Sequence, residues 1–192
     1  MKKFGRSLIS APTLILAAVA MAGSAPARAD DVVRWQTIIG LIQPGNAVGS
    51  GTSQVLGGIQ PWSALGGQAK LNLQTGQLEF NVRGLVRAGG NGIGIPELAT
   101  TPSTPLTHVI GTLVCDTDGS AGNGNSTVVN TDPVPISATG DARFSGVVQL
   151  PAACLSEPDI AFLIGISDPQ VDVSRWLANG AVRRRSSGDN DD

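Results

Sequence analysis

Hydrophobic and polar residues alternate strictly along residues 68–83, on both sides of a short glycine-containing segment at 74–77. Because successive side chains of a β-strand point to opposite faces, this pattern predicts a hairpin with one buried and one solvent-exposed face. The expected cross-strand pairs are Leu73 with Leu78, Leu71 with Phe80, and Ala69 with Val82. All six apolar side chains then share the buried face.

Other segments repeat this signal and are separated by turns rich in Gly, Pro, Asn and Asp. The further expected strands are 32–42, 106–115, 126–131, 134–138, 142–150, 160–166 and 174–182. No window after residue 29 shows a sustained apolar stripe at helical spacing. The sequence therefore predicts an all-β fold, namely an antiparallel two-sheet β-sandwich, with a barrel or a jelly roll as the alternative.

Residues 1–29 are typical of a cleaved secretory signal peptide. They begin with basic residues, continue with an apolar run and end in the small-residue sequence Ala27-Arg28-Ala29. The uninterrupted part of the apolar run is shorter than a transmembrane helix, which needs about 20 residues. We therefore expect an exported protein, located in the periplasm or outside the cell, with no membrane insertion after the leader is cleaved.

The rest of the chain is expected to form one β-sandwich domain over residues 30–182, a length that allows a substantial core. Residues 183–192 contain arginines, small polar residues and aspartates but no large apolar side chain. A segment that cannot bury apolar surface is expected to be disordered. The sequence therefore predicts a disordered C-terminal tail that begins at Arg183.

Removal of the leader changes the net charge of the protein. Four of the 13 Lys and Arg residues lie before Asp30, whereas none of the 15 Asp and Glu residues do. Residues 30–192 therefore carry nine basic and 15 acidic side chains, a net charge of −6. The basic residues are scattered along the chain, and such a protein is a poor electrostatic partner for nucleic acid or anionic lipid. Neither is expected as a partner.

Cys115 and Cys154 are the two cysteines of the chain. In an oxidising compartment they are expected to form a disulfide, which would close a loop of about 40 residues and stabilise the fold by about 4 kcal/mol. The one histidine, His108, lies an odd number of residues before Cys115, so on one strand their side chains would point to opposite faces. A catalytic thiol-imidazole pair is therefore not expected. One histidine and no methionine after residue 29 also exclude blue-copper and poly-histidine zinc sites.

Two glycine-rich loops exceed what a connection between strands requires, so they are the candidate ligand-binding segments. In the loop 87–105 the candidates are Asn91 and Glu97, and the glycines do not match a dinucleotide-binding motif. The candidates in the loop 116–126 are Asp116, Asp118, Asn123 and Asn125.

The carboxylates of Asp116 and Asp118 are candidate ligands of calcium, which takes oxygen donors. The loop departs from the helix-loop-helix calcium motif, because Ala121 stands at the position of its glycine and Thr127 at that of its glutamate. Asp and Asn are also common in turns, since their side chains bond to the local backbone. A purely structural role of the loop is therefore the alternative to calcium binding.

These features favour a secreted or periplasmic, non-catalytic protein that acts as a binding or surface-structural module through the two loops. One alternative is a glycosidase-like hydrolase with paired carboxylates, for which Glu97, Asp116 and Asp118 are the first candidates. Another is a binding module in which calcium only orders the loop 116–126. No other cofactor is expected, and the sequence contains no serine-nucleophile motif of the G-x-S-x-G or S-x-x-K type.

Overall fold

The computed structural model of the protein describes residues 32–89, 93, 97–98, 104–121, 123–156, 159–167 and 175–185. The predicted signal peptide over residues 1–29 lies outside them. The described residues form short strands, one five-residue helix and one 3-10 turn, so the all-β class expected from the sequence is confirmed. Among these residues, no helix has the length and apolar character needed to span a bilayer.

The first half of the chain contains β1 (Val32–Gly40), β2 (Ala47–Val48), the 3-10 turn η2 (Gly51–Ser53), β3 (Val55–Gly57), β4 (Trp62–Ser63), β5 (Gly66–Asn72), β6 (Gln77–Arg83), β7 (Val86–Arg87) and β8 (Glu97–Leu98). The second half contains β9 (Thr104–Pro105), β10 (His108–Cys115), β11 (Thr127–Asn130), β12 (Val134–Pro135), β13 (Ala142–Val147), the helix α1 (Ala152–Ser156), β14 (Ala161–Ile166) and β15 (Arg175–Arg185). The short strands β2, β3, β4, β7, β8 and β9 are not predicted by the sequence pattern.

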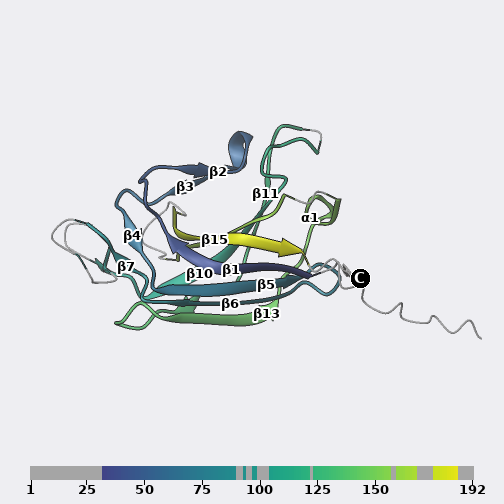
Figure 1. The fold of residues 1–192 in the computed structure, drawn as a ribbon. Helices are drawn as coiled ribbons and strands as arrows, with labels where there is room; N and C mark the ends of the chain where they lie inside the picture. The colour runs from purple at the N-terminus through teal and green to yellow at the C-terminus, as the bar shows by residue number, and fades with distance from the viewer. Residues whose placement is uncertain are drawn as a thin grey trace, which may run out of the picture.

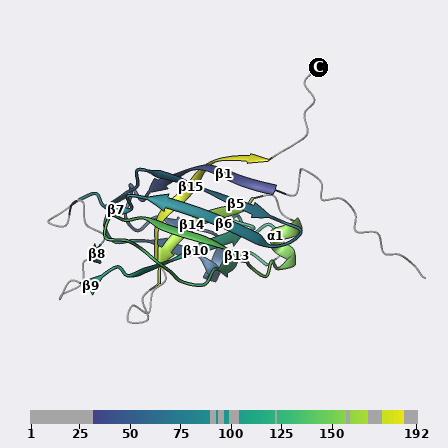
Figure 2. The same ribbon diagram turned by 90° about the horizontal axis from the view of Figure 1, so that it is seen from below.

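Eleven of the described strands form one curled sheet, which gives the protein the shape of a half-barrel (Figure 1, Figure 2). Its main path runs β11-β10-β14-β15-β1-β5-β6-β13, and the pairs along this path are antiparallel. β12 also pairs with β10, and β3, which pairs with β2, contacts the start of β15 in parallel. The two-stranded sheets β4-β7 and β8-β9 complete the described strands.

The expected antiparallel pairing is confirmed, but the strands do not form two stacked sheets. β1 pairs with β15 on one side and with β5 on the other, so strands from both ends of the described chain belong to the same sheet. Side-chain alternation shows which residues face the core but not which strands are neighbours. The sequence pattern therefore could not separate one curled sheet from a sandwich, and the half-barrel lies closer to the barrel alternative.

The predicted hairpin is present as β5 and β6, but its register differs from the prediction by two residues. Leu71 pairs with Leu78, and Leu73 lies in the turn. The Asn72 side chain explains the shift, because its Oδ1 accepts hydrogen bonds from the backbone N–H groups of residues 74 and 75, at 2.9 and 3.0 Å. Since the shift is an even number of residues, the buried and exposed faces of both strands stay as predicted.

The inner side of the half-barrel holds the hydrophobic core. The rings of Trp35 and Phe80 lie 5.5 and 5.4 Å from the ring of Phe162, measured between centroids. Gly111 allows this packing, because a Cβ atom at that position would lie 2.7 Å from Cε1 of Phe80. β1 therefore contributes the aromatic side chain of Trp35 to the core. The side chains on either side of Trp35 point away from the core.

The expected disulfide between Cys115 and Cys154 is present. Cys115 ends β10, Cys154 lies in α1, and both are fully buried. The sequence does not indicate α1, because a single helical turn is too short to show a helical period. The bridge fastens the segment after β13 to the end of β10, and a disulfide of this kind is typical of proteins from oxidising compartments.

The last strand extends further than predicted. β15 continues to Arg185, whereas the sequence analysis places the start of a disordered tail at Arg183. Residues 183–185 pair with residues 33–35 of β1, because the backbone hydrogen bonds of a ladder do not require apolar side chains. β15 thus extends three residues into the segment predicted to be a tail, and the rest of that segment, residues 186–192, lies outside the described residues.

Replacement of both cysteines, Cys115→Ser with Cys154→Ser, is expected to lower the free energy of unfolding by about 4 kcal/mol, because the bridge closes a loop with a sequence separation of 39 residues. Urea unfolding followed by tryptophan fluorescence measures this change. Reduction of the native protein should have the same effect as the double substitution. Equal stability of the native and serine proteins would contradict a stabilising role of the bridge.

Candidate functional site

The first predicted loop, 87–105, is partly regular. Glu97 begins β8, whose two residues pair with Thr104 and Pro105 of β9. Part of the segment is therefore a short ladder. Asn91, the other candidate in this loop, lies outside the described residues.

In the second predicted loop, 116–126, the carboxylate of Asp116 accepts hydrogen bonds from residues of the same loop. Asp116 is 1% exposed and adopts a positive φ of 54°, directly after the disulfide-bonded Cys115. Its carboxylate accepts hydrogen bonds from the backbone N–H of Ala121 at 3.1 Å and from the hydroxyl of Ser120 at 3.4 Å. Asp116 thus makes the local backbone contacts that are typical of aspartate in a tight turn.

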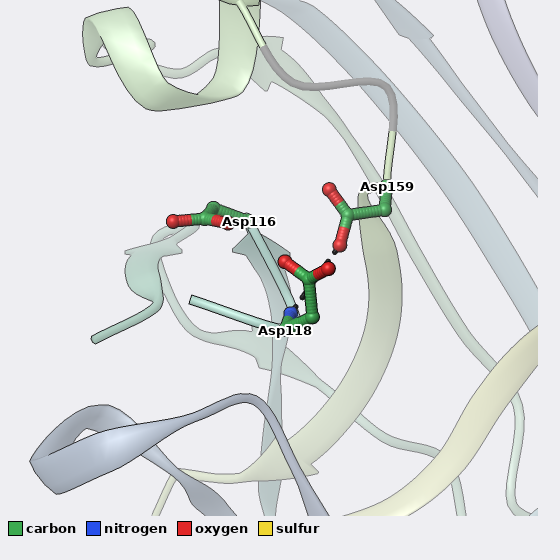
Figure 3. Close-up of side chains that lie close together, drawn as sticks. All are labelled: Asp116, Asp118 and Asp159. Atoms are coloured by element: carbon green, nitrogen blue, oxygen red, sulfur yellow. Dashed lines mark hydrogen bonds between the residues drawn. The ribbon is translucent and has the colours of Figure 1, made fainter. Parts of the chain in front are cut away.

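Asp118 and Asp159 face one another beside Asp116 (Figure 3). Each of the three carboxylates offers an oxygen, and these oxygens lie within 4.8 Å of one another. Oδ2 of Asp159 accepts hydrogen bonds from the Thr117 hydroxyl at 2.6 Å and from the Asp118 backbone N–H at 3.4 Å. Oδ1 of Asp159 is buried without a hydrogen-bond partner. Such a set of oxygen donors suits a hard cation, above all calcium.

The two predicted asparagines hold the loop in place. Oδ1 of Asn123 accepts a hydrogen bond from the backbone N–H of Asn125 at 3.1 Å. Oδ1 of Asn125 accepts hydrogen bonds from the backbone N–H and the hydroxyl of Thr52, at 2.8 and 3.1 Å. These contacts join the loop after β10 to the turn η2, so both amide oxygens are already used within the protein.

Asp159 is not singled out by the sequence, because it lies far from Asp116 along the chain. The signal that could identify it is the predicted disulfide. Pairing of Cys154 with Cys115 brings the residues that follow α1 close to the start of the loop 116–126. Once the bridge is assigned, acids that follow Cys154 are therefore expected to lie close to acids that follow Cys115.

A second candidate site lies on the outer face of the sheet. Outward side chains of β1, β5, β6 and β13 line an open groove of about 720 Å³. A neighbouring hollow of about 550 Å³ shares several of these residues and continues toward Gly66. The side chains of this outer groove are Arg34, Gln36, Gln68, Lys70, Glu79, Asn81, Arg143 and Ser145, with Arg83 in the continuation.

The strand register places these side chains in rows across the sheet. Lys70 of β5 stands opposite both Arg34 of β1 and Glu79 of β6. Ser145 of β13 follows Glu79 in the same row. The next row contains Gln68, Asn81 and Arg143. Because directly opposite residues have Cβ atoms about 4.5–5.5 Å apart, a ligand in the outer groove could contact several of these groups at once.

The outer groove gathers positive charge on an acidic protein. Arg34, Lys70, Arg83 and Arg143 are four of the nine basic residues that follow position 29. Glu79 is the one acid among the described residues that line the groove and its continuation. Basic residues that are scattered along the sequence are thus brought together by the strand order.

Asp141 lies directly before β13, where the charges of Arg83 and Arg143 act on its carboxylate. Its carboxylate accepts hydrogen bonds from the backbone N–H of Gly84 and from the hydroxyl of Thr139, each at 2.9 Å. The pKa of Asp141 is held below its ordinary value of 3.8, mainly by the hydrogen bond from Gly84. The hydrogen bond from Thr139 and the positive charges of Arg83 and Arg143 act in the same direction. The ionised carboxylate therefore joins the end of β6 to the start of β13.

The sequence predicts the composition of the outer groove only in part. It identifies the exposed face of the hairpin, which includes Lys70 and Glu79, and the polar face of the strand that includes Arg143. It gives no sign that these faces lie beside Arg34, because strand neighbours are not visible in the alternation. A prediction of strand order would be the signal that reveals the groove.

Comparison of the chain with protein-family models, curated proteins and solved structures finds no match. The two candidate sites are therefore judged by their own chemistry. The loop cluster offers carboxylate oxygens, whereas the outer groove offers cations and amides.

Replacement of Asp141 by asparagine, Asp141→Asn, is expected to lower the Tm at about pH 6, because it removes an ionised group that the fold stabilises. A carboxyl group with a lowered pKa stabilises the folded state above its ordinary pKa of 3.8 and loses this contribution as the pH falls through the lowered value. The difference in Tm between the two proteins should therefore shrink below pH 3.8.

Thermal unfolding over a pH series measures this difference. Asp132→Asn is the matched control, because Asp132 is an exposed acid in the connection between β11 and β12. A Tm difference for Asp141→Asn that stays constant into strong acid would contradict the assigned role of Asp141.

Proposed function

We propose that the protein is an exported, non-catalytic binding protein that holds its ligand in the outer groove. The observation that supports this proposal is the open hollow of about 720 Å³, lined by polar side chains from four adjacent strands. Strands within an antiparallel sheet hold their side chains in fixed positions, which lowers the entropic cost of binding. The proposed site lies on the sheet rather than on the two loops. The side-chain oxygens of three loop candidates already accept hydrogen bonds from the protein backbone, namely those of Asp116, Asn123 and Asn125.

The residues of the outer groove favour binding over hydrolysis. Hydrolysis by paired carboxylates requires two acids on either side of the scissile bond. Glu79 is the single acid among the described lining residues. Asp116, one of the acids of the hydrolase alternative, is buried and its carboxylate already accepts hydrogen bonds from its own loop.

The proposed location is the periplasm or the exterior of the cell. A disulfide is typical of oxidising compartments, and residues 1–29 have the pattern of a secretory leader. The amide groups of Gln36, Gln68 and Asn81 line the groove, and an amide both donates and accepts hydrogen bonds. Groups of this kind match hydroxyl-rich molecules, so a glycan is the favoured ligand.

Blocking the groove tests the proposal. Ser145→Trp places an indole ring at an exposed groove position on β13, and Gln54→Trp places the same ring at an exposed position outside the groove. The probes are immobilised neutral and charged polysaccharides, and binding is measured by biolayer interferometry. We expect at least one polymer to bind the native and Gln54→Trp proteins and to bind Ser145→Trp about tenfold more weakly, a loss of about 1.4 kcal/mol.

Circular dichroism should show the same β-rich spectrum for all three proteins, so that a loss of binding is not a loss of folding. Equal binding by Ser145→Trp and Gln54→Trp would place the ligand outside the groove. Absence of binding to every polymer in the panel would also count against the proposal.

Calcium binding by the loop 116–126 is a second candidate function, favoured by one specific observation. Oδ1 of Asp159 is buried without a partner in a cluster of three carboxylates. A buried polar atom without a hydrogen bond is costly, and a bound cation would compensate for this cost. Asp116, Asp118 and Asp159 would then hold the ion, which would order the loop without taking part in a reaction.

Calcium at about 100 times its Kd is expected to raise the Tm of the native protein by about 5–10 °C, because a ligand that binds only the folded state stabilises it. Thermal unfolding with calcium and with a chelator measures the shift. Asp159→Asn should abolish the shift, whereas Asp132→Asn, a change in an exposed acid outside the cluster, should retain it. A Tm that does not respond to calcium would exclude this function.

A further inference from the structure

We infer that the outer groove selects acidic polysaccharides, which are extended polymers that carry carboxylate or sulfate groups among their hydroxyls. This inference rests on the proposed function, because it names the ligand class of the same groove. It starts from the charges of Arg34, Lys70, Arg83 and Arg143, which lie outside the hydrophobic core and line the groove and its continuation. These four side chains point away from the core, and none of them is fully buried.

The first argument is that like charges stand next to each other. Arg34 and Lys70 are cross-strand partners. Like charges directly opposite in neighbouring strands destabilise a sheet. Glu79 is the next partner of Lys70, yet within the described part of the chain neither Arg34 nor Lys70 makes an ion pair or a side-chain hydrogen bond. An anionic ligand would supply the missing negative charge.

The second argument is the spacing of the charges. Arg34 lies on β1 and Arg143 on β13, with β5 and β6 between them. Three strand spacings of about 4.8 Å separate β1 from β13, so the cations span roughly 14 Å. A single small anion would reach the cations at one side only, whereas a polymer would reach both sides. The amides of Gln68 and Asn81 lie between the charges, where they match the hydroxyls of a sugar chain.

The third argument separates acidic glycans from nucleic acids and neutral glycans. Stacking of nucleobases requires exposed aromatic rings, and sugar faces also stack on such rings. The rings of Trp35 and Phe80 are 2% and 3% exposed and belong to the core. Phe144, the third aromatic residue at the groove, stacks on Phe80 with 5.7 Å between ring centroids. Beside the half-buried ring of Phe144, charge and hydrogen bonding are therefore the main means of recognition that the groove offers.

The full-length protein is tested against four immobilised polymers, which are polygalacturonate, dextran sulfate, neutral dextran and single-stranded DNA, and against vesicles that contain an anionic lipid. We expect binding to at least one of the two acidic polysaccharides, weakened by added salt, and little binding to neutral dextran. Binding to polygalacturonate identifies carboxylate as the recognised group, and binding to dextran sulfate identifies sulfate. Either result supports the inference.

Variants with matched changes in net charge locate the effect. Lys70→Gln and Gln54→Glu each lower the net charge by one, but Gln54 is an exposed residue outside the groove. Lys70→Gln should bind the acidic polymer about two- to fivefold more weakly and with a smaller salt dependence, whereas Gln54→Glu should bind like the native protein. Glu79→Gln and Asp132→Asn each raise the net charge by one. Glu79→Gln should bind about two- to fivefold more tightly, and Asp132→Asn should show no change.

Several results would overturn the inference. Equal effects of Lys70→Gln and Gln54→Glu would show that the charge of the whole protein, and not the groove, controls binding. Tighter binding to DNA or to anionic vesicles than to both acidic polysaccharides would assign a different partner. Binding of neutral dextran as tightly as the acidic polymers, if lost in Ser145→Trp, would overturn the ligand class but retain the proposed function. If Ser145→Trp weakens binding to none of the polymers, the proposed function fails as well.

Discussion

The pairing of β1 with strands on both sides is the constraint on which the rest of the structure depends. Through β15 and β5 this strand joins the two ends of the described chain into one sheet. Its inward residue Trp35 packs against Phe162 in the core, and its outward residue Arg34 stands beside Lys70 in the outer groove. The core and the groove thus lie on opposite faces of the same strands. A shift of β1 by one residue would turn its core side chains toward the groove and its groove side chains toward the core.

The disulfide has a comparable influence near the β11 edge of the sheet, at the end of β10. It fixes α1 against the end of β10, and Asp159 thereby comes within reach of Asp116 and Asp118. The resulting loop is tied to the rest of the protein by the contact of Asn125 with Thr52. The loop 116–126 is therefore held by both the disulfide before it and hydrogen bonds, and it is distinct from the groove on the sheet.

Much of the fold follows from local patterns, and its remaining features depend on long-range pairing. Alternation identifies the hairpin and its buried face, but the Asn72 side chain sets a turn that alternation cannot reveal. Spacing and compartment identify the disulfide, yet the approach of Asp159 to the loop appears only once the bridge is formed. The outer groove is the least predictable feature, because Arg34 and Lys70 meet through strand order, which no local pattern encodes.

The position of β15 has a consequence for the way in which this protein reaches its native state. β15 is the last described strand along the chain, yet it lies inside the sheet between β14 and β1, the first described strand. When a chain emerges from a ribosome or a translocation channel, β1 has no neighbour on that side until β15 is free. Its hydrogen-bonding edge remains open for association with other chains during that interval. We therefore expect closure of the half-barrel to wait for β15 and to be slow, because it joins distant parts of the chain.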